Sequence, residues 1–112
     1  METDEKDLML TVAWLFARHG QRKRARTILE CVVEEDPSNG IAAAVLADLM
    51  LADGEAQEAL HILRNAEFPA GMKRAEAMLE TRALKALGRA DEAVSRWRRF
   101  VKSSKGDERE WF

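Results

Sequence analysis

The fold is decided by residues 46–63, which read LADLMLADGEAQEALHIL. Apolar residues recur at helical spacing on both sides of Gly54, so the stretch predicts two helices. Glycine adopts positive φ at little cost and commonly ends a helix, which places a tight turn at Gly54. Five positions later, Ala59 is small enough to let the two helices approach each other closely. The stretch therefore predicts an antiparallel helical hairpin.

The same pattern occurs three times along the chain, at an interval of 34 residues. It consists of the turn glycine, an alanine five residues later and a large apolar residue four residues further on. The three sets are Gly20, Gly54 and Gly88; Ala25, Ala59 and Ala93; and Leu29, Leu63 and Trp97. A fixed period of this length is typical of an architecture built from repeated hairpins. We therefore expect an all-α protein of three antiparallel helix pairs.

The repeats occupy most of the chain of 112 residues, which is the length of one domain. We expect a single domain over residues 1–112, with repeats at about 6–39, 40–73 and 74–103 and a short polar C-terminal tail. Helices are expected near residues 6–18, 22–35, 39–52, 56–66, 70–86 and 90–103. Asn39 follows a break at Pro37 and is the expected N-cap of the third helix.

Composition excludes several classes of protein. Hydrophobic residues make up 46% of the chain and charged residues 34%, which is the balance of a soluble helical protein. A formal net charge of −2 argues against a dedicated nucleic-acid-binding domain, because such domains usually carry a basic excess. The longest apolar stretch, residues 41–52, is too short to cross a bilayer, and the acidic N-terminus is unlike a signal peptide. We therefore expect a cytoplasmic protein.

Residues that could carry catalysis or bind a metal are scarce. The only cysteine, Cys31, has no disulfide partner, and its place in a helical pattern predicts a buried core thiol. His19 and His61 lack the companion ligands at the spacing that a zinc site needs. No nucleophile is paired with a base, and no glycine-rich phosphate loop is present. The basic run at residues 21–26 is interpreted as a solvated helix face. The sequence predicts no enzyme activity, no metal and no cofactor.

The 34-residue period, the central turn glycine, the small residue early in each second helix and a proline near the end of the repeat resemble the tetratricopeptide repeat (TPR) family. Pro37 stands at the expected place, whereas Pro69 lies two residues early. The large aromatic residue near the start of each first helix is missing, and Glu80 occupies a position that is usually apolar. The resemblance covers about residues 6–100. It implies a right-handed helical solenoid that binds another protein.

In such a solenoid the first helix of each pair lines a concave face. Positions counted back from each turn glycine predict which residues face it. The residues expected to bind a partner are Leu10, Trp14, Ala17, Ile41, Ala44, Leu51 and Met78. This apolar groove suits an amphipathic helix or an extended apolar segment of a partner protein, with Trp14 as the strongest anchor. Ordinary packing between repeats is the alternative role for Leu10, Ile41 and Met78.

Many TPR domains hold the C-terminal carboxylate of a partner through Lys and Asn residues in the groove. Those clamp positions are filled by Leu10, Trp14, Val45, Ala75 and Leu79 in this chain. We therefore do not expect the chain to bind a chaperone tail in that way.

A chain of three repeats and little else resembles the small TPR chaperones of bacterial type III secretion, most closely the YscY (SctY) group. The resemblance is carried by residues 13–17 (AWLFA), residues 25–29 (ARTIL), Asp36-Pro37, Leu46-Ala47 and residues 87–93 (LGRADEA). It implies a cytoplasmic bacterial protein that forms a heterodimer with a small secreted protein of the YscX (SctX) type. The chaperone would keep this partner soluble and bring it to the export gate, touching the membrane only through its partners. Two alternatives remain: the YscG type, which shields the needle subunit, and a homo-oligomeric TPR scaffold in another assembly.

The end of the third repeat lacks a cover in the sequence. After Val101 the chain is short and polar, with no room for the extra helix that commonly caps a TPR array. The last apolar face, which includes Val94 and Trp97, then needs the tail, a second copy or a partner. Trp111 and Phe112 are expected to fold back on the third repeat, and insertion into a neighbouring molecule is the alternative.

Overall fold

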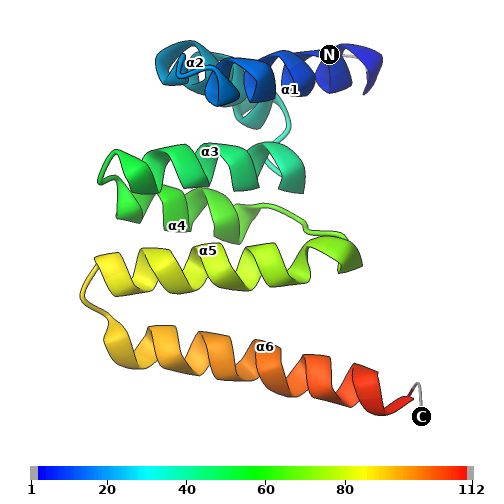
Figure 1. Cartoon of the computed structure of the whole chain (residues 1–112), viewed down its shortest axis with the longest axis vertical. Coiled ribbons are helices and arrows are strands. Elements are labelled where there is room, and N and C mark those ends of the chain that lie inside the picture. Colours follow the sequence, from blue (N-terminus) through cyan, green and yellow to red (C-terminus); the bar gives the residue numbers. More distant parts are fainter. Residues whose placement is uncertain (1–2, 111–112) are drawn as a thin grey trace.

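The computed structural model describes the backbone of residues 3–110 and the side chains of residues 4–104. Within that range the chain forms six α-helices and one 3-10 helix, and it has no strand (Figure 1). The elements are α1 (Thr3–Arg18), α2 (Arg22–Glu35), α3 (Gly40–Ala52), α4 (Ala56–Asn65), η1 (Ala70–Met72), α5 (Lys73–Ala86) and α6 (Ala90–Glu110). The described part of the protein is all-helical, as the repeat pattern predicts.

Consecutive helices run in opposite directions; α1 and α2 overlap at one end of the view, and α3, α4, α5 and α6 follow in chain order to the other end (Figure 1). Each helix contacts the next one along the chain, and α3 also contacts α5. The molecule measures 40 × 35 × 24 Å. The helices therefore pack as adjacent pairs, and α1 and α6 are the outermost members of the arrangement.

The three turns between paired helices share one hydrogen-bond pattern. Gly20, Gly54 and Gly88 have φ of 77°, 82° and 77°, a left-handed conformation that favours glycine. In each turn the amide that follows the glycine donates to a carbonyl five residues earlier. These bonds are Gln21 to Phe16 (2.8 Å), Glu55 to Met50 (2.8 Å) and Arg89 to Leu84 (2.9 Å). This is a Schellman cap, which satisfies carbonyls at the end of the helix. The repeated glycine thus fixes three equivalent hairpins.

The connection between the first two repeats is fixed by a helix cap at the start of α3 and by a hydrogen bond from the linker after α4. Asn39 caps α3 as predicted, because its side chain accepts a hydrogen bond from the amide of Ala42 at 3.0 Å. The amide of Glu67 donates to the carbonyl of Ser38 at 2.9 Å, which ties this turn to the linker after α4. A Cβ on Gly40 would lie 2.6 Å from the carbonyl oxygen of Glu67, so only glycine fits there. The contact between Glu67 and Ser38 was not predicted, because it joins segments that are far apart in the sequence.

The core consists mainly of alanine and leucine from all three repeats. Its largest fully buried side chains are Leu29, Leu46, Leu60, Leu63, Leu84 and Val32. Cys31, which the helical pattern assigned to the core, is exposed, so that prediction was wrong. The buried face of α2 consists of Ala25, Leu29 and Val32. Successive residues of a helix point about 100° apart, and Cys31 therefore lies beside that face and not on it.

The last helix is longer than predicted. An end near residue 103 followed by a polar tail was expected, whereas α6 continues to Glu110. The added residues are mostly charged residues with high helix propensity, and the one glycine among them, Gly106, costs only about 1 kcal/mol in a helix. Trp111 and Phe112, expected to fold back, lie outside the described residues.

Glu80 is the one buried charged residue among the described side chains, at a position where the other repeats carry Val12 and Leu46. Arg96 of α6 donates to its carboxylate at 3.1 Å, and both side chains are nearly buried. The positions that correspond to Arg96 carry Ile28 and Ile62. The third repeat therefore has an ion pair where the first two have two apolar residues.

Candidate protein-binding groove

The first helices of the three pairs, α1, α3 and α5, line one open groove with a volume of about 560 Å³. Most of its lining residues are apolar, and four are charged. They are Trp14, Ala17, Arg18, Arg22, Ala44, Val45, Asp48, Leu49, Ala75, Met78, Leu79 and Arg82. Only Arg22 comes from a second helix, α2. The groove is thus formed by the equivalent helix of each of the three repeats.

The apolar surface of the groove combines small and aliphatic residues with two large exposed side chains. Ala44 of α3 and Ala75 of α5 contribute short side chains to its floor. Trp14 from α1 and Met78 from α5 are both exposed, at 48% and 45%. Trp provides a large, rigid contact area, and Met is flexible enough to adapt to different apolar surfaces. The groove therefore offers two apolar anchors on opposite sides of a shallow floor.

The charges of the groove are unevenly paired. Arg82 donates to Asp48 at 2.8 Å, so these two side chains join α5 to α3 across the groove. Arg22 donates to Asp53 at 2.7 Å and also reaches the carbonyl of Leu49. The guanidinium of Arg18 lies 4.8 Å from the centre of the Trp14 ring, a cation–π contact. It has no carboxylate partner among the described side chains. The end of the groove near Trp14 is therefore positively charged.

Four of the seven predicted partner-binding residues line this groove: Trp14, Ala17, Ala44 and Met78. The other three lie elsewhere. Leu10 is partly buried against the main core, and Leu51 is partly buried between the two core clusters. Ile41 is exposed in the first turn of α3 but is not among the groove-lining residues. Long leucine side chains turn toward apolar neighbours when these are within reach, which sequence spacing alone does not show.

Several residues that line the groove were not among the predicted partner-binding residues. Val45 and Leu79 stand nine residues before their turn glycines, at positions considered only for a carboxylate clamp. Leu49 precedes its glycine by five residues, and Arg22 begins α2. The equivalence of Val45 and Leu79 across repeats was the available signal. The involvement of Arg22 depends on how the first repeat packs on the second, so the sequence carried no sign of it.

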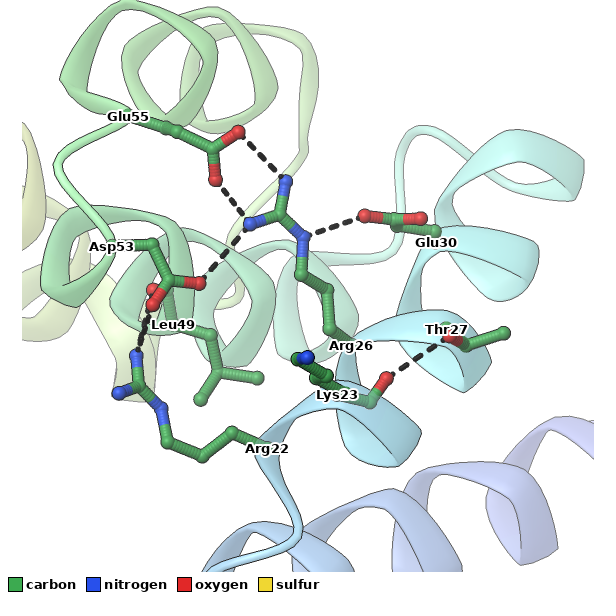
Figure 2. A network of polar contacts seen from close by, with 8 residues as sticks. All are labelled: Arg22, Lys23, Arg26, Thr27, Glu30, Leu49, Asp53 and Glu55. Atoms are coloured by element: carbon green, nitrogen blue, oxygen red, sulfur yellow. Dashed lines mark hydrogen bonds and ion pairs between the residues drawn. The ribbon is translucent and has the colours of Figure 1, made fainter.

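The basic run at residues 21–26 is more than a solvated helix face. Figure 2 shows two of its arginines reaching from α2 to the turn of the second repeat. Arg26 bonds to Glu30 in its own helix, to Asp53 at 3.1 Å, and to both oxygens of Glu55. These hydrogen bonds, that to Glu55 first, raise the pKa of Arg26, and the bond from Arg26 lowers the pKa of Glu55. The network joins the first repeat to the second beside the groove.

The described side chains hold no group of three or more His, Cys, Asp or Glu residues arranged to bind a metal ion. No helix in residues 3–110 combines the length and the apolar character that crossing a membrane would require. Comparison with models of protein families gave no match, and a search of curated proteins gave none either.

Proposed function

We propose that this chain is a TPR-type, right-handed helical solenoid that binds an apolar helix of another protein in the groove of α1, α3 and α5. The observation that carries the proposal is the groove itself, to which each repeat contributes its first helix. The 34-residue spacing of the turn glycines supports the TPR assignment, since each glycine ends the first helix of a hairpin in the same way. Its role is binding, with no catalytic step.

The groove favours one kind of partner. An amphipathic helix can place its apolar face on the alanine floor and insert side chains beside Trp14 and Met78. Arg18 is available for an acidic side chain at one end, and partial burial on binding would strengthen such a pair. At the other end, Asp48 and Arg82 already neutralise each other. We therefore expect an apolar helix with an acidic residue near the Trp14 end.

Within this class, the proposed role is that of a cytoplasmic chaperone of bacterial type III secretion, of the YscY (SctY) type. It would hold a small secreted protein of the YscX (SctX) type until export. The support is the resemblance in residues 13–17 and 87–93 together with a groove sized for one segment. The rival role in the same machinery, shielding the needle subunit as YscG does, uses the same chemistry. A homo-oligomeric scaffold would instead leave the groove free.

Co-expression separates these roles. The chain is produced with the YscX-type protein or with the needle subunit of the same organism, and the soluble complex is isolated through a tag on the chain. The YscY assignment predicts a stable 1:1 complex with the first protein and none with the second. The reverse result identifies the needle-chaperone role. No complex with either protein would contradict the secretion role.

Two groove variants test where the partner binds. Trp14→Ala removes the main aromatic anchor, and Met78→Glu places a charge in the apolar surface. Truncating an interface aromatic of this kind costs about 2 kcal/mol or more, so we expect at least a roughly thirtyfold weaker complex. The matched control is Ile41→Ala, which removes a similarly exposed apolar side chain from α3 outside the groove. Normal binding by both groove variants, with helical content unchanged, would refute the groove as the binding site.

A further inference from the structure

One position of the repeat lies at the junction with the next repeat in the first two copies and is exposed in the third. It lies six residues after each turn glycine and carries Arg26, Leu60 and Val94. Arg26 reaches Asp53 and Glu55 of the second repeat. Leu60 is 1% exposed and is buried in a cluster with residues of the third repeat. Val94 is 48% exposed. The outer face of α6 thus exposes a position that the second repeat buries against the third.

The matching half is exposed on α1. The cluster around Leu60 includes Ala83 and Leu84 of α5, which correspond to Leu15 and Phe16 in the first repeat. Ala83 is fully buried, whereas Leu15 is 44% exposed. Leu8 is 65% exposed, although its counterpart in the second repeat, Ala42, is fully buried by the preceding helices. The outer face of α1 therefore carries two large apolar side chains, Leu15 at a position that both other repeats bury and Leu8 at one that the second repeat buries.

The two end faces have complementary spacing. Consecutive helices of the stack are antiparallel, so a helix added after α6 in the same manner would run opposite to it (Figure 1). Pairing Val94 with Leu15, as Leu60 pairs with the third repeat, brings Val101 level with Leu8. Each pair is separated by seven residues, or about 10 Å along its helix. Both apolar pairs can then form at once.

The charges are complementary in the same orientation. The first 72 residues carry 7 Lys and Arg against 13 Asp and Glu, whereas residues 73–112 carry 11 against 7. The exposed acids Asp4 and Glu5 begin α1, one turn before Leu8. The exposed bases Arg98 and Lys102 lie near the middle of α6, before and after Val101 in the sequence. Antiparallel packing places the acidic start of one helix beside the basic part of the other, which is favourable.

We propose that copies of this chain associate head to tail, with the outer face of α1 of one copy packed antiparallel on the outer face of α6 of the next. The contact continues the internal stacking across a molecular boundary. It is heterologous, so both end faces of a dimer remain partly unsatisfied and further copies can add. The contact uses neither Trp14 nor Met78, and it therefore goes beyond the proposed groove function and does not depend on it.

Sedimentation equilibrium of the purified chain at increasing concentration tests this association. We expect the average mass to rise above 12.7 kDa with concentration and to fall back when salt screens the charges. Leu15→Asp disables the α1 face and Val94→Asp disables the α6 face, so each variant alone should remain monomeric. Mixing the two leaves one intact junction, and the mixture should stop at a dimer of twice 12.7 kDa. Gln57→Glu, an exposed charge change on α4, is the control and should associate normally.

Three results would overturn the proposal. The first is a chain that stays monomeric at every concentration. The second is a single variant that still dimerises, because a symmetric contact of α6 with α6 or of α1 with α1 survives loss of the other face. The third is an equimolar mixture that remains monomeric. The charge variants Asp4→Lys and Lys102→Glu touch no buried residue and guard against loss of folding. Each alone should weaken association, and mixing the two should restore it.

Discussion

At the scale of single residues, the third repeat differs from the others in the pair formed by Glu80 and Arg96. Both side chains are nearly buried, and each is the partner that makes burial of the other tolerable. Removing one partner of a buried pair leaves an uncompensated charge, whereas replacing both with apolar residues is often neutral or stabilising. The first two repeats already contain that apolar solution at the same positions.

A double-mutant cycle tests this interpretation. Glu80→Leu and Arg96→Ile introduce the residues that the second repeat carries, and each single change should destabilise the protein by about 3 kcal/mol. The double variant should return to within about 1 kcal/mol of the natural chain. Urea denaturation followed by circular dichroism measures all three values. Effects that simply add in the double variant would show that the two residues do not stabilise each other.

Gly40 is a second position at which a contact with a distant part of the chain determines the residue type. Its Cβ would meet the carbonyl oxygen of Glu67 at 2.6 Å, and the adjacent side chain of Phe68 is also close. Gly40→Ala normally favours a helix, but here it must push the linker away from α3. We expect a loss of about 1–3 kcal/mol in the free energy of unfolding, the usual range for an overpacked site. An equal or higher melting temperature in Gly40→Ala would contradict this.

At the scale of helices and turns, the junction between the first two repeats combines a buried apolar cluster with an electrostatic contact. Arg26 and Glu55 join α2 to the turn before α4 (Figure 2). The hydrogen bond from Arg26 lowers the pKa of Glu55. The folded protein therefore keeps this carboxyl group ionised at a lower pH than the unfolded chain does. Hydrogen bonds from Ser38 first and from Lys6 next likewise lower the pKa of Asp36.

This gives a pH dependence with a definite sign. A carboxyl group with a lowered pKa in the folded state stabilises the protein above its unfolded pKa, here about 4.5 for Glu. That stability is lost as the pH falls through the lower folded pKa. The melting temperature should therefore be steady near neutral pH and decline in acid. Glu55→Gln should lower the melting temperature at pH 7 and reduce the acid-dependent decline. If the melting temperatures of the two proteins fell by the same amount from pH 7 to pH 3, the role given to Glu55 would be contradicted.

The elements were predictable because their boundaries are set locally. The turn glycines adopt positive φ and form hydrogen bonds within six residues, and Asn39 caps its own helix. Such signals are present in the sequence itself. The end of α6 was missed because no cap or proline marks it, and a single glycine, Gly106, is a weak terminator.

At the scale of the whole molecule, the groove was only partly predictable. Counting from the turn glycines identified Trp14 and Met78, because side chains at equivalent positions of equivalent helices point the same way. It misplaced Leu51, which turns inward between two clusters, and it could not find Arg22, whose position depends on packing between repeats. The prediction that Cys31 is buried was wrong for the same reason, because burial depends on the neighbouring helices as well as on periodicity.

The central claim is that a partner helix occupies the groove formed by α1, α3 and α5. Hydrogen–deuterium exchange of the chain, alone and in complex with the co-expressed YscX-type protein, tests it most directly. We expect slower exchange in the groove-lining helices around Trp14, Ala44 and Met78, and no change in α4, which does not line the groove. Protection confined to α4 or to the outer face of α6, with exchange around the groove unchanged, would contradict the claim.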